Sequence, residues 1–248
     1  MLVAAGVARL ERLGLARRFL VGALRATAQL VAVGYVLTGL FAADRPGLVL
    51  LALGAMLAAA TQTAGTRPRG PAAVSRRALY EASGLGLFLG AGLTLAYVTG
   101  VVLRVRPWYD ARHLVPLFGM ILGNAMNGAA LAAERLASEL ELRRGEVEAW
   151  LALGASPAQA TAEASRQAMA AALLPAANAL AVVGIVQLPG MMTGQILAGQ
   201  SPLVAVRYQL VVVFMLAGAT AATAWLVVRR YRRAFFTPAE QLAQRVPV

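Results

Sequence analysis

Residues 205–228 read AVRYQLVVVFMLAGATAATAWLVV, a run in which Arg207 is the single charged side chain. A helix needs about 20 mostly apolar residues to cross the hydrocarbon core of a bilayer. The run has that length, and it is followed directly by Arg229 and Arg230, a basic flank typical of the cytoplasmic side of a membrane. It therefore predicts a membrane-spanning helix.

Other apolar runs of this kind occur along the chain, at about 18–42, 47–64, 78–103, 113–133 and 168–188. Apolar residues make up 59% of the 248 positions, charged residues only 14%, and the mean hydropathy is +0.67. Soluble domains are less apolar and carry about 25% charged residues. We therefore expect an all-α integral membrane protein with about six transmembrane helices, built as a single domain over residues 1–248.

The positive charge is distributed as a membrane topology requires. The net charge is +12, and every basic residue is Arg. The arginines cluster at 9–18, 67–77, 135–166 and 229–245, in alternate connections between the predicted spans. Basic residues are enriched in cytoplasmic loops, so both termini are expected in the cytoplasm. This placement favours lipid as the surrounding partner and argues against a nucleic-acid partner.

The residue types that are missing exclude several chemistries. Without Lys the chain has neither a P-loop for nucleotide hydrolysis nor a Schiff-base site. Without Cys it has no thiolate site, and His113 is the single histidine, so a histidine cluster cannot form within one chain. The chain is therefore expected not to be an enzyme and to bind no cofactor itself.

The one long polar segment lies between the fourth and fifth predicted spans, at 135–166. Its first part predicts an amphipathic helix outside the bilayer, because apolar residues share one face and opposite charges stand four residues apart. The apolar residues are Leu136, Leu140, Val147 and Leu151, and the charge pairs are Arg135 with Glu139 and Arg144 with Glu148.

This first helix is expected to end at Gly154. Ser156, Pro157 and Gln159 then form the pattern of a capped helix start, with Ser156 as N-cap and Gln159 closing a capping box. The segment has two interpretations from pattern alone. It is either a connecting arm on the membrane surface or a coupling helix that contacts a cytosolic ATPase through its charges and Trp150.

Three stretches resemble a known family. They are 25–30 with 34–37, 116–128, and 183–199, and the last contains the run LPGMMTG at 188–194. Together they closely resemble the FetB-type family of ABC transporter permeases, whose bacterial members are described as iron exporters. The resemblance extends from about Leu13 to Tyr231. Family members usually begin with a further apolar span, so the chain is expected to be short at its N-terminus.

The resemblance implies a permease subunit of the bacterial cytoplasmic (inner) membrane. It implies export of iron or another metal ion, a cytosolic ABC ATPase that uses the ATP, and a permease homodimer. It also favours the coupling-helix interpretation of 135–166. The residues that resemble the ATPase-coupling signature are Arg144, Glu146, Glu148, Ala149, Trp150 and Gly154.

Polar residues inside the predicted spans suggest a substrate pathway, because they are costly in hydrocarbon. Met120, Asn124 and Asn127 form a stripe on the fourth span, and Arg25 and Gln29 share a face of the first span. The asparagines have an alternative role in helix packing, beside a GxxxG face formed by Gly119 and Gly123. Arg25 has an alternative as a residue that snorkels to the interface.

The strongest pathway candidates lie where Pro189-Gly190 is expected to break the fifth span. An irregular backbone at membrane depth is tolerated where it is buried in protein or lines a cavity. The residues concerned are Met191, Met192, Thr193 and Gln195. We expect the substrate path where the Met120 stripe meets this broken segment, and the sequence assigns no metal-ligand set.

The cargo stays open at this stage. Plant members of the resembled family have been linked to movement of a sugar nucleotide, so a permease for a non-metal cargo is one alternative. A permease-like membrane protein that transports nothing is another.

Overall fold

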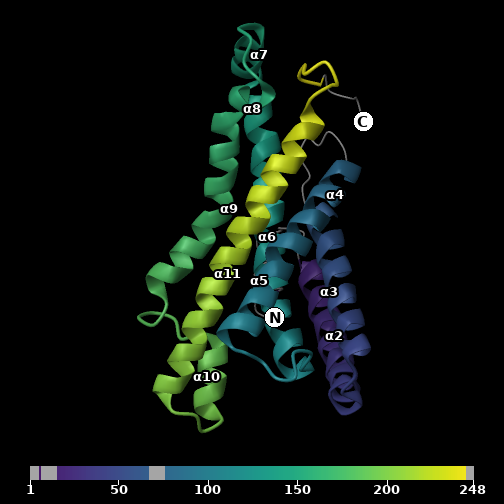
Figure 1. The fold of residues 1–248 in the computed structure, drawn as a ribbon, viewed down its shortest axis with the longest axis vertical. Coiled ribbons are helices and arrows are strands. Elements are labelled where there is room, and N and C mark those ends of the chain that lie inside the picture. Colours follow the sequence, from purple (N-terminus) through teal and green to yellow (C-terminus); the bar gives the residue numbers. More distant parts are fainter. Residues whose placement is uncertain (1–5, 7–15, 67–75, 244–248) are drawn as a thin grey trace. The chain divides into compact units, whose positions relative to one another are not determined.

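The computed structural model describes residue 6 and residues 16–66 and 76–243, and these described residues are almost entirely helical (Figure 1). The longer helices are α2 (Ala16–Ala43), α3 (Pro46–Thr66), α4 (Arg76–Gly86), α6 (Ala111–Leu142), α9 (Ala162–Val182) and α11 (Pro202–Tyr231). The shorter ones are α5 (Gly92–Tyr97), α7 (Arg144–Ala152), α8 (Pro157–Ala160) and α10 (Gly190–Leu197). Two π-helical segments, η1 (Leu87–Ala91) and η2 (Val98–Val102), and a 3-10 turn, η3 (Arg232–Phe235), complete the described elements.

Five described helical stretches are long and apolar enough to cross a membrane. They are Phe19–Ala43, Pro46–Thr66, Arg76–Val102, Ala111–Leu142 and Pro202–Phe235. The predicted span 168–188 corresponds to α9, which is not among them: α9 ends at Val182, before the last apolar residues of the predicted span, and its start includes Arg166 and Gln167. The described residues are thus helical, with five helices that could span a membrane, and a sixth span stays a prediction.

The chain divides into two compact units, Met1–Val49 and Leu50–Val248. In the first unit α2 is exposed along most of its length, with apolar side chains such as Leu24, Leu30 and Tyr35 on its surface. Such a surface suits a lipid environment, where exposed apolar side chains carry no hydrophobic cost. That the whole chain forms one permease domain stays a prediction.

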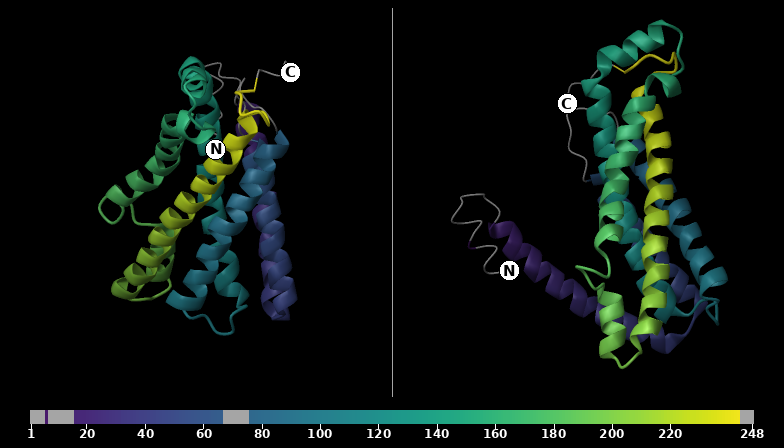
Figure 2. Two further views of the ribbon diagram at one scale, coloured as in Figure 1. Left: turned by 45° about the horizontal axis from the view of Figure 1, so that its top comes forward. Right: turned by 90° about the vertical axis from the view of Figure 1, so that its left-hand side faces the viewer.

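In the second unit α11 is the central helix, since it contacts α4, α6, α9 and α10 (Figures 1 and 2). Two glycines allow the closest approaches. A Cβ atom added at Gly90 would lie 2.4 Å from Oγ1 of Thr223, and one added at Gly128 would lie 2.5 Å from Cγ2 of Thr220. Small residues at such crossings are typical of helices packed within a membrane.

The expected GxxxG contact on the fourth span is only partly present. A Cβ atom at Gly119 would lie 3.2 Å from the end of Met56, whereas one at Gly123 would meet nothing within 4 Å. The tight face of α6 therefore centres on Gly128, where α11 crosses, and not on the Gly119–Gly123 pair.

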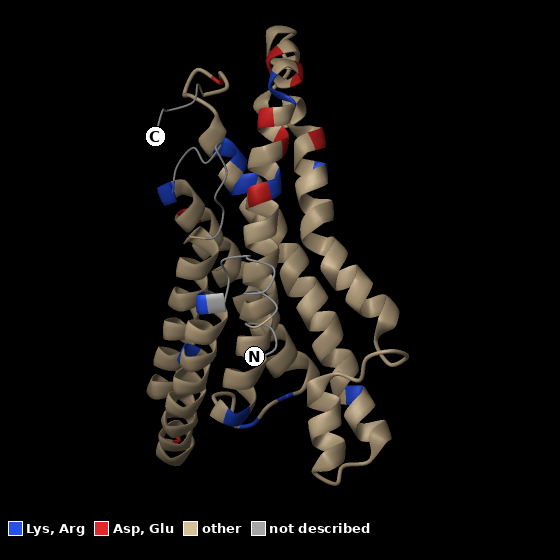
Figure 3. Ribbon diagram, turned by 180° about the vertical axis from the view of Figure 1, so that it is seen from behind, with Lys and Arg blue, Asp and Glu red and all other residues tan. Residues whose placement is uncertain are grey.

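Charged residues of the second unit gather mostly toward the end that carries α7 (Figure 3). Helix α6 continues without a break from its apolar part into this charged end. A change from apolar to charged side chains does not interrupt the backbone hydrogen bonds of a helix. It ends at Leu142, so the expected helix over 135–153 is divided between α6 and α7 at Arg143.

The local predictions for this segment are otherwise confirmed. Arg135 pairs with Glu139 at 2.8 Å and Arg144 with Glu148 at 2.9 Å. Ser156 caps α8 in a complete capping box with Gln159. Leu136, Leu140 and Val147 are buried in one cluster, and Leu151 packs against it.

Candidate functional site

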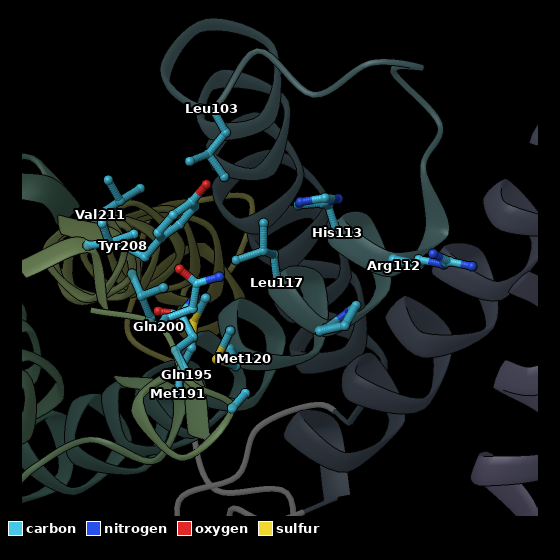
Figure 4. A pocket seen from close by; sticks show the side chains of 14 residues that line it. Leu103, Arg112, His113, Leu117, Met120, Met191, Gln195, Gln200, Tyr208 and Val211 are labelled. Atoms are coloured by element: carbon cyan, nitrogen blue, oxygen red, sulfur yellow. The ribbon is translucent and has the colours of Figure 1, made fainter. Parts of the chain in front are cut away.

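A cavity of about 720 Å³ (Figure 4) lies beside α10, at the end of the second unit opposite α7 (Figure 1). That is the size range of pockets that hold small molecules. Its walls come from the start of α6, from α10 and the turn after it, and from the first half of α11. The lining residues are Leu103, Arg112, His113, Pro116, Leu117, Met120, Met191, Gln195, Ala198, Gln200, Val204, Tyr208, Val211 and Val212.

The structure brings together part of the predicted pathway. Met120 of α6 lies beside Met191 and Gln195 of α10, so the fourth span and the broken segment meet as expected (Figure 4). The break is longer than predicted: α9 ends at Val182, and α10 begins only after Pro189. Between them Gly184 has a φ of +83°, a left-handed backbone that favours glycine.

Other predicted pathway residues do not line the cavity. Asn124 is exposed, and its side-chain amide donates a hydrogen bond to the carbonyl of Met120 at 3.0 Å. Asn127 is also exposed. Met192 and Thr193 are half-buried on another face of α10, and the Thr193 hydroxyl donates to the Pro189 carbonyl at 3.1 Å.

Arg25 and Gln29 lie on α2 in the first unit, where both are exposed. They share a helix face, as their spacing predicts. Their part in a pathway stays a prediction.

Sequence reasoning missed four polar residues of the lining: Arg112, His113, Gln200 and Tyr208. Arg112 and His113 lie at the start of α6, Gln200 lies in the turn before α11, and Tyr208 lies in the second turn of α11, positions where such residues are ordinary and give no signal. Figure 4 shows that the Arg112 side chain points away from the Met120, Met191 and Gln195 group. The one available sequence signal was His113, as the single histidine of the chain.

The cavity rim is organised by Asp110, the N-cap of α6. Its carboxylate accepts a hydrogen bond from the Arg112 backbone N–H at 3.1 Å and contacts Nδ1 of His113. Burial acts to raise the pKa of Asp110, but the hydrogen bonds from His113 and Arg112 outweigh it and hold the pKa below its ordinary value. Asp110 therefore carries a negative charge at neutral pH that fixes the His113 ring at the rim.

Gln195, which lines the cavity, has a side-chain hydrogen-bond acceptor without a partner among the described residues. Its side-chain Oε1 is buried and has no hydrogen-bond partner among the described residues. Such an oxygen costs about 1–3 kcal/mol. A water or a ligand that donates a hydrogen bond would remove this cost, so Gln195 is suited to contact a polar group in the cavity.

The predicted coupling residues lie at the other end, on α7 and the turn after it. Arg144 pairs with Glu148, and Glu146 pairs with Arg143 at 3.2 Å. The Arg144 guanidinium also donates hydrogen bonds to the carbonyl of Ala243, at 3.5 Å from Nη1 and 3.4 Å from Nη2. The Arg144 guanidinium thus contacts Glu148 and the Ala243 carbonyl of the same chain.

The remaining coupling residues face outward. Ala149 is exposed, and the Trp150 side chain is 51% exposed. Gly154 has a φ of +88°, and the turn it makes leaves Leu153 81% exposed. Trp150 and Leu153, three residues apart in the sequence, both expose apolar side chains at the tip of the second unit, and this pair is here called the apolar surface beside α7.

Comparisons with known proteins agree with this architecture. A family model described as "Uncharacterised protein family (UPF0014)" matches residues 1–236. The UPF0014 membrane protein slr1647 of Synechocystis sp. is 40% identical over 220 residues, which are 88% of this chain and 83% of that protein. The UPF0014 membrane protein STAR2 of Oryza sativa subsp. japonica is 38% identical over 236 residues, 94% of this chain and 79% of its own.

A third relative carries a functional name. The "Probable iron export permease protein FetB" of Escherichia coli strain K12 is 33% identical over 242 residues, 98% of this chain and 90% of its own. No solved structure matches the chain significantly. Because the family model and these relatives each cover most of its length, the chain is a multi-pass membrane protein that belongs to the UPF0014 family, together with the FetB-type permeases.

Proposed function

We propose that the chain is the membrane subunit of an ABC exporter, that a separate cytosolic ATPase supplies the energy, and that this ATPase contacts α7. The observation that carries the proposal is the apolar surface of Trp150 and Leu153 beside the charges of α7. An exposed Trp within a polar rim is a typical energetic centre of a protein interface. In this proposal α7 lies outside the bilayer, so Trp150 and Leu153 would face water unless a partner covers them.

The attachment of α7 to α6 also supports a docking role for α7. Val147 is buried against Leu136 and Leu140 of α6. Across the joint at Arg143, the carboxylate of Glu139 pairs with Arg135 at 2.8 Å and with Arg143 at 2.9 Å, and its side chain is only 6% exposed. The Glu139 carboxylate is buried while the two guanidiniums are partly exposed, so these pairs tie the joint at Arg143 to the last turns of α6.

The proposed cargo is a metal ion, with iron first because one relative is named an iron export permease. The path would pass Met120, Met191 and Gln195, whose thioether and amide groups meet in the cavity. In this proposal two copies of the permease act together in the bacterial cytoplasmic membrane. The chain itself catalyses no reaction, and its partner hydrolyses the ATP.

A non-metal cargo, such as a sugar nucleotide, is the second candidate. Among the described residues, the cavity lining contains amides, a phenol, an imidazole and a guanidinium but no acidic side chain. Carboxylates are the usual protein ligands of hard cations. A lining without them favours a cargo that is recognised by hydrogen bonds.

The ATPase contact is tested by two matched tryptophans. The complex of the permease with its ATPase is reconstituted in proteoliposomes, with Trp150→Ala in one sample and Trp108→Ala in another. Trp108 is 61% exposed but lies at the opposite end, between η2 and α6. Trp150→Ala is expected to weaken ATPase binding by about 10-fold or more, and Trp108→Ala to leave it unchanged. Equal effects of both changes would refute the assignment of α7.

The cargo is tested in the same vesicles. ATP-dependent movement of Fe²⁺ is compared with that of a radiolabelled sugar nucleotide. Movement of one of them identifies the cargo class. Movement of neither, with the ATPase bound, would favour the permease-like protein that transports nothing.

A further inference from the structure

The chain continues beyond α11 into a closed segment at 232–243, here called the C-terminal hook. Phe236 and Leu242 form an antiparallel bridge, and the Ala243 N–H donates a hydrogen bond to the Phe235 carbonyl at 2.8 Å. Thr237 closes the turn, since its hydroxyl accepts from the Gln241 N–H at 3.2 Å. The hook therefore has a defined backbone path that starts directly from the last turn of α11.

The hook is packed into the same apolar cluster as α7. Phe235 is 4% exposed and lies edge-on to Tyr231, with ring centres 5.0 Å apart. Phe236 and Leu242 pack against the cluster that contains Val147 of α7. The hook and α7 thus share one hydrophobic core, although they are far apart in the sequence.

Arg144 joins the two by hydrogen bonds. It donates to the carbonyl of Ala243 through Nη1 and Nη2, while its Nε pairs with Glu148 at 2.9 Å. A planar guanidinium presents several donors in a fixed geometry, so Arg144 can hold a carbonyl and a carboxylate together. Helix α7 is consequently attached at two places, to α6 through Arg143 and to α11 through the hook.

At its other end, α11 forms one wall of the cavity, with Val204, Tyr208, Val211 and Val212. It has 30 residues, and at about 1.5 Å per residue it is about 45 Å long. Its contacts with α4, α6, α9 and α10 keep it in one packed unit. A displacement of α7 would therefore reach the cavity along α11 as well as along α6.

We propose that the C-terminal hook is a transmission link, through which movement of α7 displaces α11 and the cavity wall that α11 carries. Arg144 is then a positioning residue of the coupling apparatus and not a contact of the ATPase. The link rests on the proposed function, because it needs an ATPase to move α7. It adds a second mechanical connection, which the coupling-helix interpretation does not contain.

The link is tested in proteoliposomes that contain the full chain and its ATPase. Three quantities are measured: ATPase affinity, ATP hydrolysis rate, and cargo moved per ATP. The variants are Arg144→Gln, which removes the charged donors, Arg144→Lys, which keeps a cationic donor, and Leu242→Ala, which removes an apolar side chain of the hook and leaves every residue of α7 unchanged. Arg166→Gln is the control, since it removes an exposed guanidinium that pairs with Glu163 on α9, outside both α7 and the hook.

We expect Arg144→Gln and Leu242→Ala to bind the ATPase normally and to move about 5-fold less cargo per ATP, or less still. Arg144→Lys should recover much of the loss, and Arg166→Gln should stay near the unmodified protein. If Leu242→Ala fails to fold, the comparison of Arg144→Gln with Arg144→Lys still tests whether Arg144 belongs to the link.

Two results would overturn the link. Reduced ATPase affinity in Arg144→Gln with normal transport in Leu242→Ala would make Arg144 a direct ATPase contact. Unchanged transport per ATP in both variants would show that α6 alone carries the movement. Absence of any complex with the unmodified chain would instead refute the proposed function.

Discussion

The guanidinium of Arg144 lies 3.4 Å from the carbonyl oxygen of Ala243, which is 99 residues further along the chain. This contact joins the start of α7 to the end of the C-terminal hook. It is partly shielded from solvent, because the Arg144 side chain is 31% exposed. Its contribution to the stability of the fold and its contribution to transport are two separate quantities.

For stability, Arg144→Gln is expected to lower the free energy of unfolding by about 1 kcal/mol, the usual net contribution of a hydrogen bond. Arg166→Gln serves as the control, since its pair with Glu163 is far more exposed and such pairs contribute little. Thermal unfolding in detergent measures both. Equal losses in the two variants would show that the Ala243 contact adds nothing beyond a surface ion pair.

In the cavity, Gln195→Leu should change stability and transport in opposite directions. The substitution removes a buried oxygen without a hydrogen-bond partner, so the protein is expected to unfold at the same or a slightly higher temperature. Transport per folded complex is expected to fall, because the polar contact to the cargo is lost. Asn124→Ala, outside the cavity, should alter neither quantity by much. A loss of stability in Gln195→Leu would mean that Oε1 is used in the folded protein.

At the crossing of η1 and α11, Gly90→Ala is expected to destabilise the fold by about 1–3 kcal/mol, the cost of overpacking. The new Cβ atom would lie 2.7 Å from the backbone nitrogen of Thr223, so a rotamer change cannot relieve the clash. Gly92→Ala is the matched control, since a Cβ atom there meets nothing within 4 Å. Thermal unfolding of the two variants, two residues apart, checks the helix crossing directly.

After α7, Gly154→Ala is expected to cost about 1–2 kcal/mol for backbone reasons alone. The φ of +88° is unfavourable for any residue with a Cβ atom, although the space around Gly154 is open. Gly145→Ala, inside α7 and equally open, should be neutral or stabilising because Ala favours helices. A similar unfolding temperature for both variants would contradict the left-handed turn.

The pH dependence of stability should report on Asp110. Because its hydrogen bonds hold the pKa below the ordinary value of 3.8, the carboxylate stabilises the fold above that value. The contribution is lost as the pH falls through the lower pKa of the folded state. Asp110→Asn is therefore expected to unfold at a lower temperature than the unmodified protein at pH 7, and the gap should close on acidification. A gap that stays constant with pH would contradict the assigned hydrogen bonds.

The amino-acid sequence by itself determined the features that depend on neighbouring residues. The apolar runs predict the spanning helices, and the spacing of Ser156, Pro157 and Gln159 predicts the capped start of α8. Charge pairs at four-residue spacing, such as Arg144 with Glu148, also form as expected. These features need only one or two turns of backbone, so their geometry follows directly from residue spacing.

Only the tertiary structure decided which distant residues meet. The cavity combines Met120, Met191 and Tyr208 from three helices, and Arg144 contacts Ala243, which lies 99 residues further along the chain. Periodicity shows which face of a helix is apolar or small but not which helix packs on it. For that reason the sequence suggested Gly119 and Gly123 as the tight face of α6, whereas the crossing of α11 places it at Gly128. Contacts between segments far apart in the chain depend on the packing of whole helices, and no local pattern encodes them.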